Sequence, residues 1–512
     1  MELELKKGCL DAYESSGSMN LTQEETAETI VPDYCPDIAR IVNTEGRVYL
    51  HSRELRDGRG ELSGTIRVSV LYTPDGEKGL RTLEFAMPFT VQSERGSFPQ
   101  CHHLMAQTEI ASLETRMLNP RKVFTRCKLF TRMTGYEKTQ LTFCTDVEAE
   151  EKLCVEKRQT QQHAVLLNDI AEKDFTFTDE MVLSASREGA AELLSSRIRS
   201  AVTDTKVVGN KLIFKGMFHI GVLYRTGEGK CASGDAELPF SQIMEIAEGT
   251  EEDACEVQMQ PTGADIQISG DDPEGRQLSV TIYFHAATFL HREQEITLLE
   301  DLYSTSYNTS YDAAPLELTA FRETMTRRQT VREILEIGVV AETILSLSAE
   351  CGAVSVGREG QSSILRTSVT VRALYLDEGG AALMAERSIE VSLHLELPEE
   401  CAVTAEACCG EEPQGSIGDR GIEVRFPVDF SIQAESRCRR VCISAARLDD
   451  EAPKDTAGAP SLVLRCLGRE ESAWDLAKKY HTTIAAILSA NQLEAETDIP
   501  RDHLLLIPKK RA

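Results

Sequence analysis

The sequence predicts a mainly β or α+β protein, with three tandem strand-rich domains followed by a small β-α-α-β domain. A length of 512 residues is enough for several domains, each with its own core. A pattern of alternating apolar and polar residues that runs into a turn occurs three times at nearly equal spacing. The last part of the chain, residues 461–512, carries helical spacing between two short apolar strands.

The repeated strand ends each time in a Leu-Tyr pair and then breaks into a turn rich in Gly, Asp or Pro. The three copies are GTIRVSVLYTPDGE (64–77), GMFHIGVLYRTGEG (216–229) and TSVTVRALYLDEGG (367–380). Their tyrosines are separated by 152 and 151 residues, at Tyr72, Tyr224 and Tyr375. The pattern predicts a half-buried strand that leads into a β-hairpin. We expect each tyrosine to pack at a sheet edge with its hydroxyl in water, and contact with a ligand is the alternative.

Similar segments flank each copy. A second strand is predicted after the hairpin, at residues 83–90, 236–241 and 389–395. A long alternating strand is predicted later, at residues 122–133, 277–289 and 421–434. A short stretch with helical spacing precedes the tyrosine strand, at residues 35–43, 189–202 and 330–344. Two packed antiparallel sheets or a distorted barrel would accommodate these elements.

The spacing divides the chain into five parts. Residues 1–155, 156–312 and 313–450 are predicted to be the strand-rich repeats, each of the usual size of a domain. Residues 451–460, EAPKDTAGAP, are predicted to be a linker, because this mixture of Pro, Gly, Ala and Asp does not support a continuous element. Residues 461–512 then form the small C-terminal domain.

The charge balance argues against nucleic acid as a partner. The chain carries 83 acidic and 55 basic residues, and its net charge is −28. A chain of this sign repels phosphate backbones and anionic lipid head groups. An acidic surface suits a basic protein partner, although it serves equally well to keep a protein in solution.

The sequence leads us to expect a cytosolic protein whose cysteines are mostly free. Charged residues interrupt the first twenty positions, so the apolar core of a secretory signal is missing. No uncharged apolar run approaches the roughly 20 residues of a membrane helix. The 15 cysteines are odd in number and scattered, and they lack the paired CxxC spacing of a zinc site. We therefore expect no metal or other cofactor.

Catalytic patterns are missing as well. GEGKC, at 227–231, lacks the first glycine and the hydroxyl residue of a phosphate-binding loop. HREQE, at 291–295, lacks the second histidine that would face a zinc ion. No GxSxG motif occurs. We therefore expect a protein without enzymatic activity and nominate no catalytic residue.

The C-terminal segment has clear start and stop signals. VLRCL, at 463–467, predicts a strand, and Ser472 begins a capping box that opens a helix. Thr483 is placed to cap a second helix that ends near Asn491. LLLIP, at 504–508, predicts the closing strand.

This order of elements, with Trp474, Ala477 and Tyr480 in a Trp-x-x-Ala-x-x-Tyr pattern, resembles a LysM domain. That family is best known for binding the N-acetylglucosamine sugars of cell walls. Trp474 is expected in the core of the domain, and a stacking platform for sugar is the alternative.

The two loops that form the sugar groove in LysM domains are altered in this chain. Sugar-binding members carry a Gly-Asp-Thr/Ser turn before the first helix and commonly a Gly-Gln pair in the second loop. A carboxylate here replaces the glycine that would permit close approach of a ligand. The resemblance therefore implies a binding surface that departs from the glycan pattern, at Glu470, Glu471, Ser472, Asp502 and His503.

Three Leu-Tyr repeats followed by one LysM-like domain resemble the SPOCS-domain, SipL-like family of spore coat morphogenesis proteins of clostridial-type endospore formers. The resemblance implies a non-enzymatic assembly factor in the mother-cell cytoplasm, placed at the outer forespore membrane. It implies that the LysM-like domain binds the coat-basement ATPase, stage IV sporulation protein A, and that the repeats bridge other coat proteins. A peptidoglycan-binding cell wall protein is the alternative, on the LysM resemblance alone.

Overall fold

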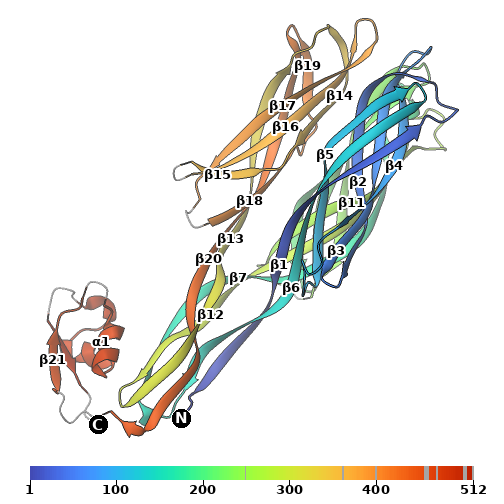
Figure 1. Cartoon of the computed structure of the whole chain (residues 1–512). Helices are drawn as coiled ribbons and strands as arrows, with labels where there is room; N and C mark the ends of the chain where they lie inside the picture. Colours follow the sequence, from blue (N-terminus) through green and yellow to red (C-terminus); the bar gives the residue numbers. More distant parts are fainter. Residues whose placement is uncertain are drawn as a thin grey trace.

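The computed structural model describes residues 1–247, 249–359, 362–397, 401–454, 460–468, 471–499 and 504–509. Antiparallel strands make up most of it, which confirms the prediction of a mainly β protein. Two α-helices occur in the part of the chain that the structure describes, and both lie after residue 470. Long strands run together toward the N-terminus, and shorter strands form lobes at the opposite end of the molecule (Figure 1).

The strands fall into three consecutive sets. The first set consists of β1 (Glu4–Ile30), β2 (Ile38–Arg56), β3 (Arg59–Pro74), β4 (Arg81–Gln92), β5 (His103–Asn119) and β6 (Lys122–Glu148). A short 3-10 turn, η1 (Glu151–Leu153), leads into the second set. The second set consists of β7 (Val155–Val182), β8 (Ala190–Val208), β9 (Lys211–Thr226), β10 (Cys231–Glu245), β11 (Ala254–Ile268) and β12 (Gln277–Ser304).

The third set has two additional short strands. It consists of β13 (Tyr307–Leu335), β14 (Ala341–Cys351), β15 (Ser355–Glu359), β16 (Ser362–Asp377), β17 (Ala382–Leu395), β18 (Cys401–Cys408), β19 (Gln414–Gly418) and β20 (Gly421–Pro453). A separate C-terminal module follows, formed by β21 (Leu462–Arg465), α1 (Ala473–Tyr480), α2 (Ile484–Asn491), the 3-10 turn η2 (Glu496–Asp498) and β22 (Leu505–Pro508).

The same pairing order occurs in each set. The first long strand pairs along its length with the last one, as β1 with β6, β7 with β12, and β13 with β20. The strand that ends in the Leu-Tyr pair is the centre of a small sheet, in the orders β2-β3-β4, β10-β9-β8 and β14-β16-β17. The remaining strand pairs with the last long strand, as β5 with β6, β11 with β12, and β18 with β20.

Apolar side chains fill each set and also join the three sets. Each set has its own buried cluster, and a further cluster lies where the three long strand pairs meet. The leucines of the three Leu-Tyr pairs, Leu71, Leu223 and Leu374, belong to one small cluster shared by all three sets. Burial of leucine side chains stabilises such a contact by roughly 1.5–3 kcal/mol each. The sets therefore pack around a common centre.

The three stretches expected to be helical are strands, so that part of the fold prediction is wrong. Residues 35–43 and 189–202 begin β2 and β8, and 330–344 spans the end of β13 and the start of β14. The pairing of β2, β8 and β14 shifts register twice near its start, after Ile38 and Ile41, Ala190 and Leu193, and Ala341 and Ile344. A bulge inserts one residue and breaks the two-residue period of a strand. The resulting apolar spacing resembles that of a helix.

The prediction that the shared tyrosine packs at a sheet edge, with its hydroxyl in water, is also wrong. Tyr72, Tyr224 and Tyr375 lie on central strands and are buried, with at most 4% of their surface exposed. The Tyr72 hydroxyl donates to the carbonyl oxygen of Pro36 at 3.2 Å, and that of Tyr224 donates to Glu188 at 3.1 Å. Each acceptor lies in the loop before the first strand of the small sheet. A backbone carbonyl thus replaces the water expected around the hydroxyl.

The three predicted domain boundaries fall at different positions relative to the strands. The division at 155/156 lies at the start of β7, whereas 312/313 and 450/451 fall inside β13 and β20. β13 and the second half of β20 are exposed on both faces over much of their length, so these stretches show little alternation. Of the predicted linker, residues 455–459 lie outside the described part of the chain.

Candidate functional site

The C-terminal module is built as its sequence signals indicate, with β21 paired to β22 and two helices between them. Ser472 caps α1, and a reciprocal capping box joins it to Asp475. The Thr483 hydroxyl accepts from the amide of Ala486 at the start of α2. The Asn491 side chain then bonds both backbone groups of Leu506 in β22, at 2.7 and 2.8 Å. Local signals therefore fix the two helices and the closing strand.

Of the predicted binding residues, Glu471 and Ser472 can be placed, and Glu470, Asp502 and His503 lie outside the described residues. Glu471 is turned into the module, where its carboxylate pairs with Arg465 at 2.5 Å and accepts from the amide of Gly468 at 3.1 Å. Ser472 is engaged in the capping box. Both side chains that can be placed therefore bind their own module.

One face of the module is closed by the second strand set. Asp301, near the end of β12, accepts from the indole N–H of Trp474 at 2.7 Å and from Lys478 at 2.6 Å. The Tyr303 hydroxyl donates to the carbonyl oxygen of Thr482 at 2.7 Å. The rings of Tyr303 and Trp474 meet edge to face, 4.9 Å apart. In Figure 1, α1 lies on the side of the module that faces the long strands.

The charges at this contact are matched. Burial raises the pKa of Asp301, but the hydrogen bonds from Lys478 and Trp474 outweigh burial and leave that pKa below its ordinary value. Burial likewise lowers the pKa of Lys478, and its bond to Asp301 raises that pKa above the usual value. Both groups are therefore charged at neutral pH. Their pairing satisfies a carboxylate that is only 7% exposed.

Trp474 is part of this contact as well as of the module core. Only 5% of its surface is exposed, and it packs in one cluster with Tyr303, Leu476 and Ile507. The expectation of a buried tryptophan is confirmed, but its environment includes a strand of another part of the chain. A sugar ring cannot stack on an indole that is covered in this way.

The opposite face of the module is apolar and open. Leu462 and Leu464 on β21 are 48% and 60% exposed, and Leu504 just before β22 is 64% exposed. Side chains two residues apart on a strand share a face, and Leu464 pairs with Leu506 across the sheet. Figure 1 places β21 on the side of the module away from the long strands. This apolar group, Leu462, Leu464 and Leu504, is called the leucine face below.

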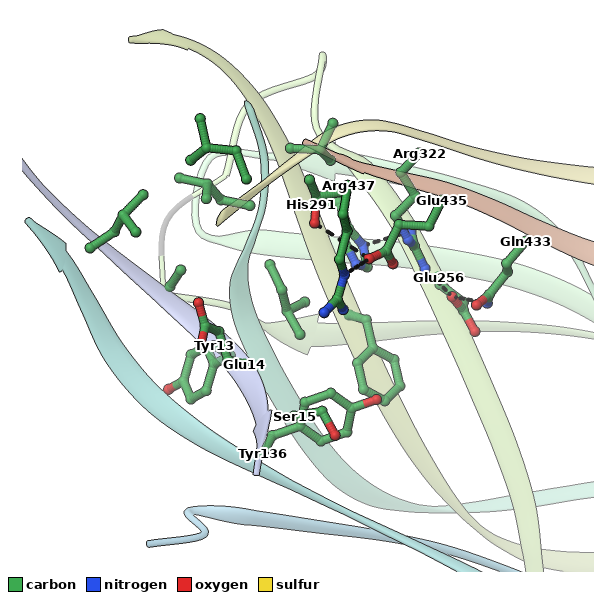
Figure 2. A pocket seen from close by; sticks show the side chains of 18 of the residues that line it. Tyr13, Glu14, Ser15, Tyr136, Glu256, His291, Arg322, Gln433, Glu435 and Arg437 are labelled. Atoms are coloured by element: carbon green, nitrogen blue, oxygen red, sulfur yellow. Dashed lines mark hydrogen bonds and ion pairs between the residues drawn. The ribbon is translucent and has the colours of Figure 1, made fainter. Parts of the chain in front are cut away.

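A second candidate is a cavity of about 630 Å³ where the three strand sets meet. Figure 2 shows the rings of Tyr13 and Tyr136 on one side of it and the charged group around Arg322 on the other. Arg322 of β13 pairs with Glu256 of β11 at 3.1 Å, and Gln433 of β20 donates to the same carboxylate at 2.6 Å. Polar side chains of the second and third sets thus bind each other across the cavity wall.

His291 completes this group. Burial, and then the neighbouring guanidinium of Arg322, lowers the pKa of His291 to about 3. The ring is therefore neutral and accepts a hydrogen bond at Nδ1 from Arg322, at 3.0 Å. Because the charged groups of the wall already bind one another, the arrangement serves to join strand sets. We place the functional surface on the module instead.

Sequence reasoning missed both Asp301 and the leucine face. Asp301 interrupts the apolar run ITLLEDLY, and a carboxylate at such a position signals a buried partner. That partner lies 173 to 177 residues further along the chain, which no local pattern reveals. Leu462 and Leu464 have the spacing of a strand, but spacing alone does not show which face the protein covers.

The fold and the module define a mainly β protein of three strand sets with a small α/β module at the end of the long strands. Residues 190–269, from β8 to the end of β11, match the family model described as SipL, SPOCS domain. The match supports a SipL-like sporulation protein. No curated protein matches this chain.

Among the residues that the structure describes, none of the helices is long and apolar enough to cross a membrane.

Proposed function

We propose that this chain is a non-enzymatic adaptor in the assembly of the spore coat. The observation that carries the proposal is the match of residues 190–269 to the SPOCS domain family model, which connects the chain with sporulation. The strands of this region, β8 to β11, form the small sheet of the second set and the strand that joins its long pair. A framework of strands with internally paired charges suits a role in holding other proteins.

The first and third strand sets are two further SPOCS-like repeats in this proposal. Their pairing order is that of the matched set, and they carry the same Leu-Tyr strand. The double bulge near the start of β2, β8 and β14 supports this, since bulges at matching positions are specific features of a fold. Three similar bodies in one chain offer three similar surfaces to coat proteins.

The C-terminal module is, in this proposal, a LysM-like domain that binds the coat-basement ATPase, stage IV sporulation protein A. Two observations favour protein over glycan as its ligand. Trp474 is covered by Tyr303, and the carboxylate of Glu471, in the altered first turn, is bound to Arg465. The leucine face, in contrast, is open, and exposed apolar patches of this kind mark protein contacts. The loops at residues 470–472 and 502–503 flank this surface in sequence.

We place the protein in the mother-cell cytoplasm, at the outer forespore membrane. Its net charge of −28 makes anionic lipid an unsuitable direct ligand, so a protein partner would supply the contact with that membrane. The same charge disfavours nucleic acid.

Capture by the full-length chain tests the proposal. The immobilised chain would be exposed in one arm to purified stage IV sporulation protein A and in the other to purified peptidoglycan. A double variant, Leu462→Ser with Leu464→Ser, removes two members of the leucine face. Ser489→Ala, at an exposed position of α2, is the matched control.

We expect capture of the ATPase by the wild type and the control, and at least a tenfold weaker capture by the double variant, corresponding to about 1.4 kcal/mol. Peptidoglycan should be retained by none of the three. Retention on peptidoglycan without capture of the ATPase would indicate that the chain is a cell wall protein and not an adaptor. Equal capture of the ATPase by all three proteins would indicate that the contact lies at the two loops and not at the leucine face.

A further inference from the structure

Two thiols of the third strand set lie within contact distance. The Sγ atoms of Cys351 and Cys409 are 3.5 Å apart, although the residues are 58 positions apart in the sequence. Cys351 is the last residue of β14, and Cys409 directly follows β18. These strands belong to two different sheets of the set. A bond between the two sulfurs would therefore join one sheet to the other.

The pair is placed next to the contact between the second and third sets. Arg199 of β8 donates through Nη1 to the carbonyl oxygens of Cys409 and Glu411, at 3.1 Å each. The hydrogen bond with Cys351, and then the charge of Arg199, lower the pKa of Cys409 in spite of burial. Cys409 is thus the sulfur more readily present as a thiolate.

A route from solvent leads to the pair. Cys351 lines a cavity of about 460 Å³ that is bounded by all three strand sets, with Val48 from β2, Met259 from β11 and Glu350 beside the thiol. Cys409 itself is 6% exposed, and its sulfur contacts that of Cys351. A small oxidant such as hydrogen peroxide fits a cavity of this volume.

We infer that Cys351 and Cys409 form a reversible intrachain disulfide when the protein meets hydrogen peroxide. The thiolate of one cysteine of the pair attacks one peroxide oxygen, the O–O bond breaks, and hydroxide leaves and takes up a proton to become water. The resulting sulfenic acid is then attacked by the sulfur of the other cysteine, the S–S bond forms, and a second water leaves with the thiol proton. Two thiols are oxidised and one peroxide is reduced to two waters.

The sulfurs must approach from 3.5 Å to the roughly 2.0 Å of a disulfide, which side-chain rotation can supply. The bond would close a loop between the two sheets and restrict the unfolded chain. It would also fix the Cys409 carbonyl that Arg199 binds, so the third set becomes more firmly attached to the second. This inference does not rest on the proposed role in coat assembly.

Peptide mapping of the oxidised protein tests the inference. The reduced, full-length chain would be treated with one equivalent of hydrogen peroxide, blocked with an alkylating reagent and digested without reductant. We expect one dominant cross-link, between the peptides of Cys351 and Cys409, which dithiothreitol removes. The midpoint of thermal unfolding should rise by about 3–8 °C on oxidation.

Two variants sharpen the test. Cys409→Ser should abolish both the cross-link and the rise in the unfolding midpoint, whereas Cys408→Ser, one residue away, should keep both. Alkylation of Cys351 and Cys409 in the oxidised wild type would overturn the inference, and so would cross-links of either one to a different cysteine. The map of the wild type decides the question even if a variant fails to fold.

Discussion

The two faces of the C-terminal module differ in whether the rest of the chain covers them. The face of α1 is closed by Asp301 and Tyr303 of β12, through matched charges, hydrogen bonds and an aromatic contact. The face of β21 presents leucines that nothing in the described chain covers. The closed face thus determines how the module is attached, and the open face determines what it can bind. Substitutions on the two faces should accordingly change different properties.

The largest effect on the attachment of the module is expected from Asp301→Ala. The substitution leaves the Lys478 ammonium and the Trp474 indole without their acceptor in a buried site, and loss of one partner of such a pair costs about 3 kcal/mol. Trp474 is the only tryptophan of the chain, so its fluorescence reports the contact directly. We expect a red-shifted emission maximum and a lower urea midpoint for that signal.

Asp450→Ala is the matched control for this substitution. Asp450 pairs with the N-terminal amine at 3.2 Å on the surface. Its replacement should leave Trp474 emission unchanged. If Asp301→Ala also leaves both emission and midpoint unchanged, the closed face is not what attaches the module.

A smaller effect is expected from Tyr303→Phe. The ring keeps its edge-to-face contact with Trp474, and only the hydrogen bond to the Thr482 carbonyl is lost. Such a loss at a buried carbonyl costs about 1 kcal/mol. Urea unfolding followed by Trp474 fluorescence measures the change. A cost equal to that of Asp301→Ala would mean that the hydroxyl contributes as much to the contact as the charged pair does.

The closed face should respond to pH in two steps. Burial, and then the charges of Lys454 and Lys509, lower the pKa of His481 at the end of α1. The unfolded ring therefore takes up a proton first, and the stability that is complete above about pH 6.5 falls as the pH drops through the folded pKa. Asp301 also has a lowered pKa, so its contribution is complete above about pH 3.9 and is lost below that value.

We expect the step below pH 4 to be the larger of the two, because the Asp301 carboxylate is the buried acceptor of the contact. A titration of Trp474 fluorescence at constant urea concentration would show both. His481→Asn should remove only the first step, because asparagine tolerates the left-handed conformation at this position, φ +55°. If the first step persists in this variant, a group other than His481 causes it.

The contrast between the two faces also shows which features of the fold can be predicted from the sequence. Capping signals at Ser472 and Thr483 are local, and they predict the helices of the module correctly. The strands that end in the Leu-Tyr pairs and the long strands after them were also predictable, because they alternate. Bulges, in contrast, hide strands such as β8 behind helical spacing. The closed face could not be predicted, because its partners are distant in sequence.

The smallest effect on stability is expected on the open face. Leu464 is 60% exposed, so Leu464→Ser removes little buried surface and should change the free energy of unfolding by no more than about 0.5 kcal/mol. Leu505, in the paired strand β22 and opposite Arg465, is 2% exposed, and Leu505→Ala should cost about 2–4 kcal/mol. Urea unfolding of the two variants side by side measures both values.

Because the two leucines lie on opposite faces of one two-stranded sheet, equal costs would show that the leucine face is covered in the folded chain. A binding surface would then have to be sought elsewhere on the module. A stable Leu464→Ser variant leaves the open face free to be tested for its partner alone.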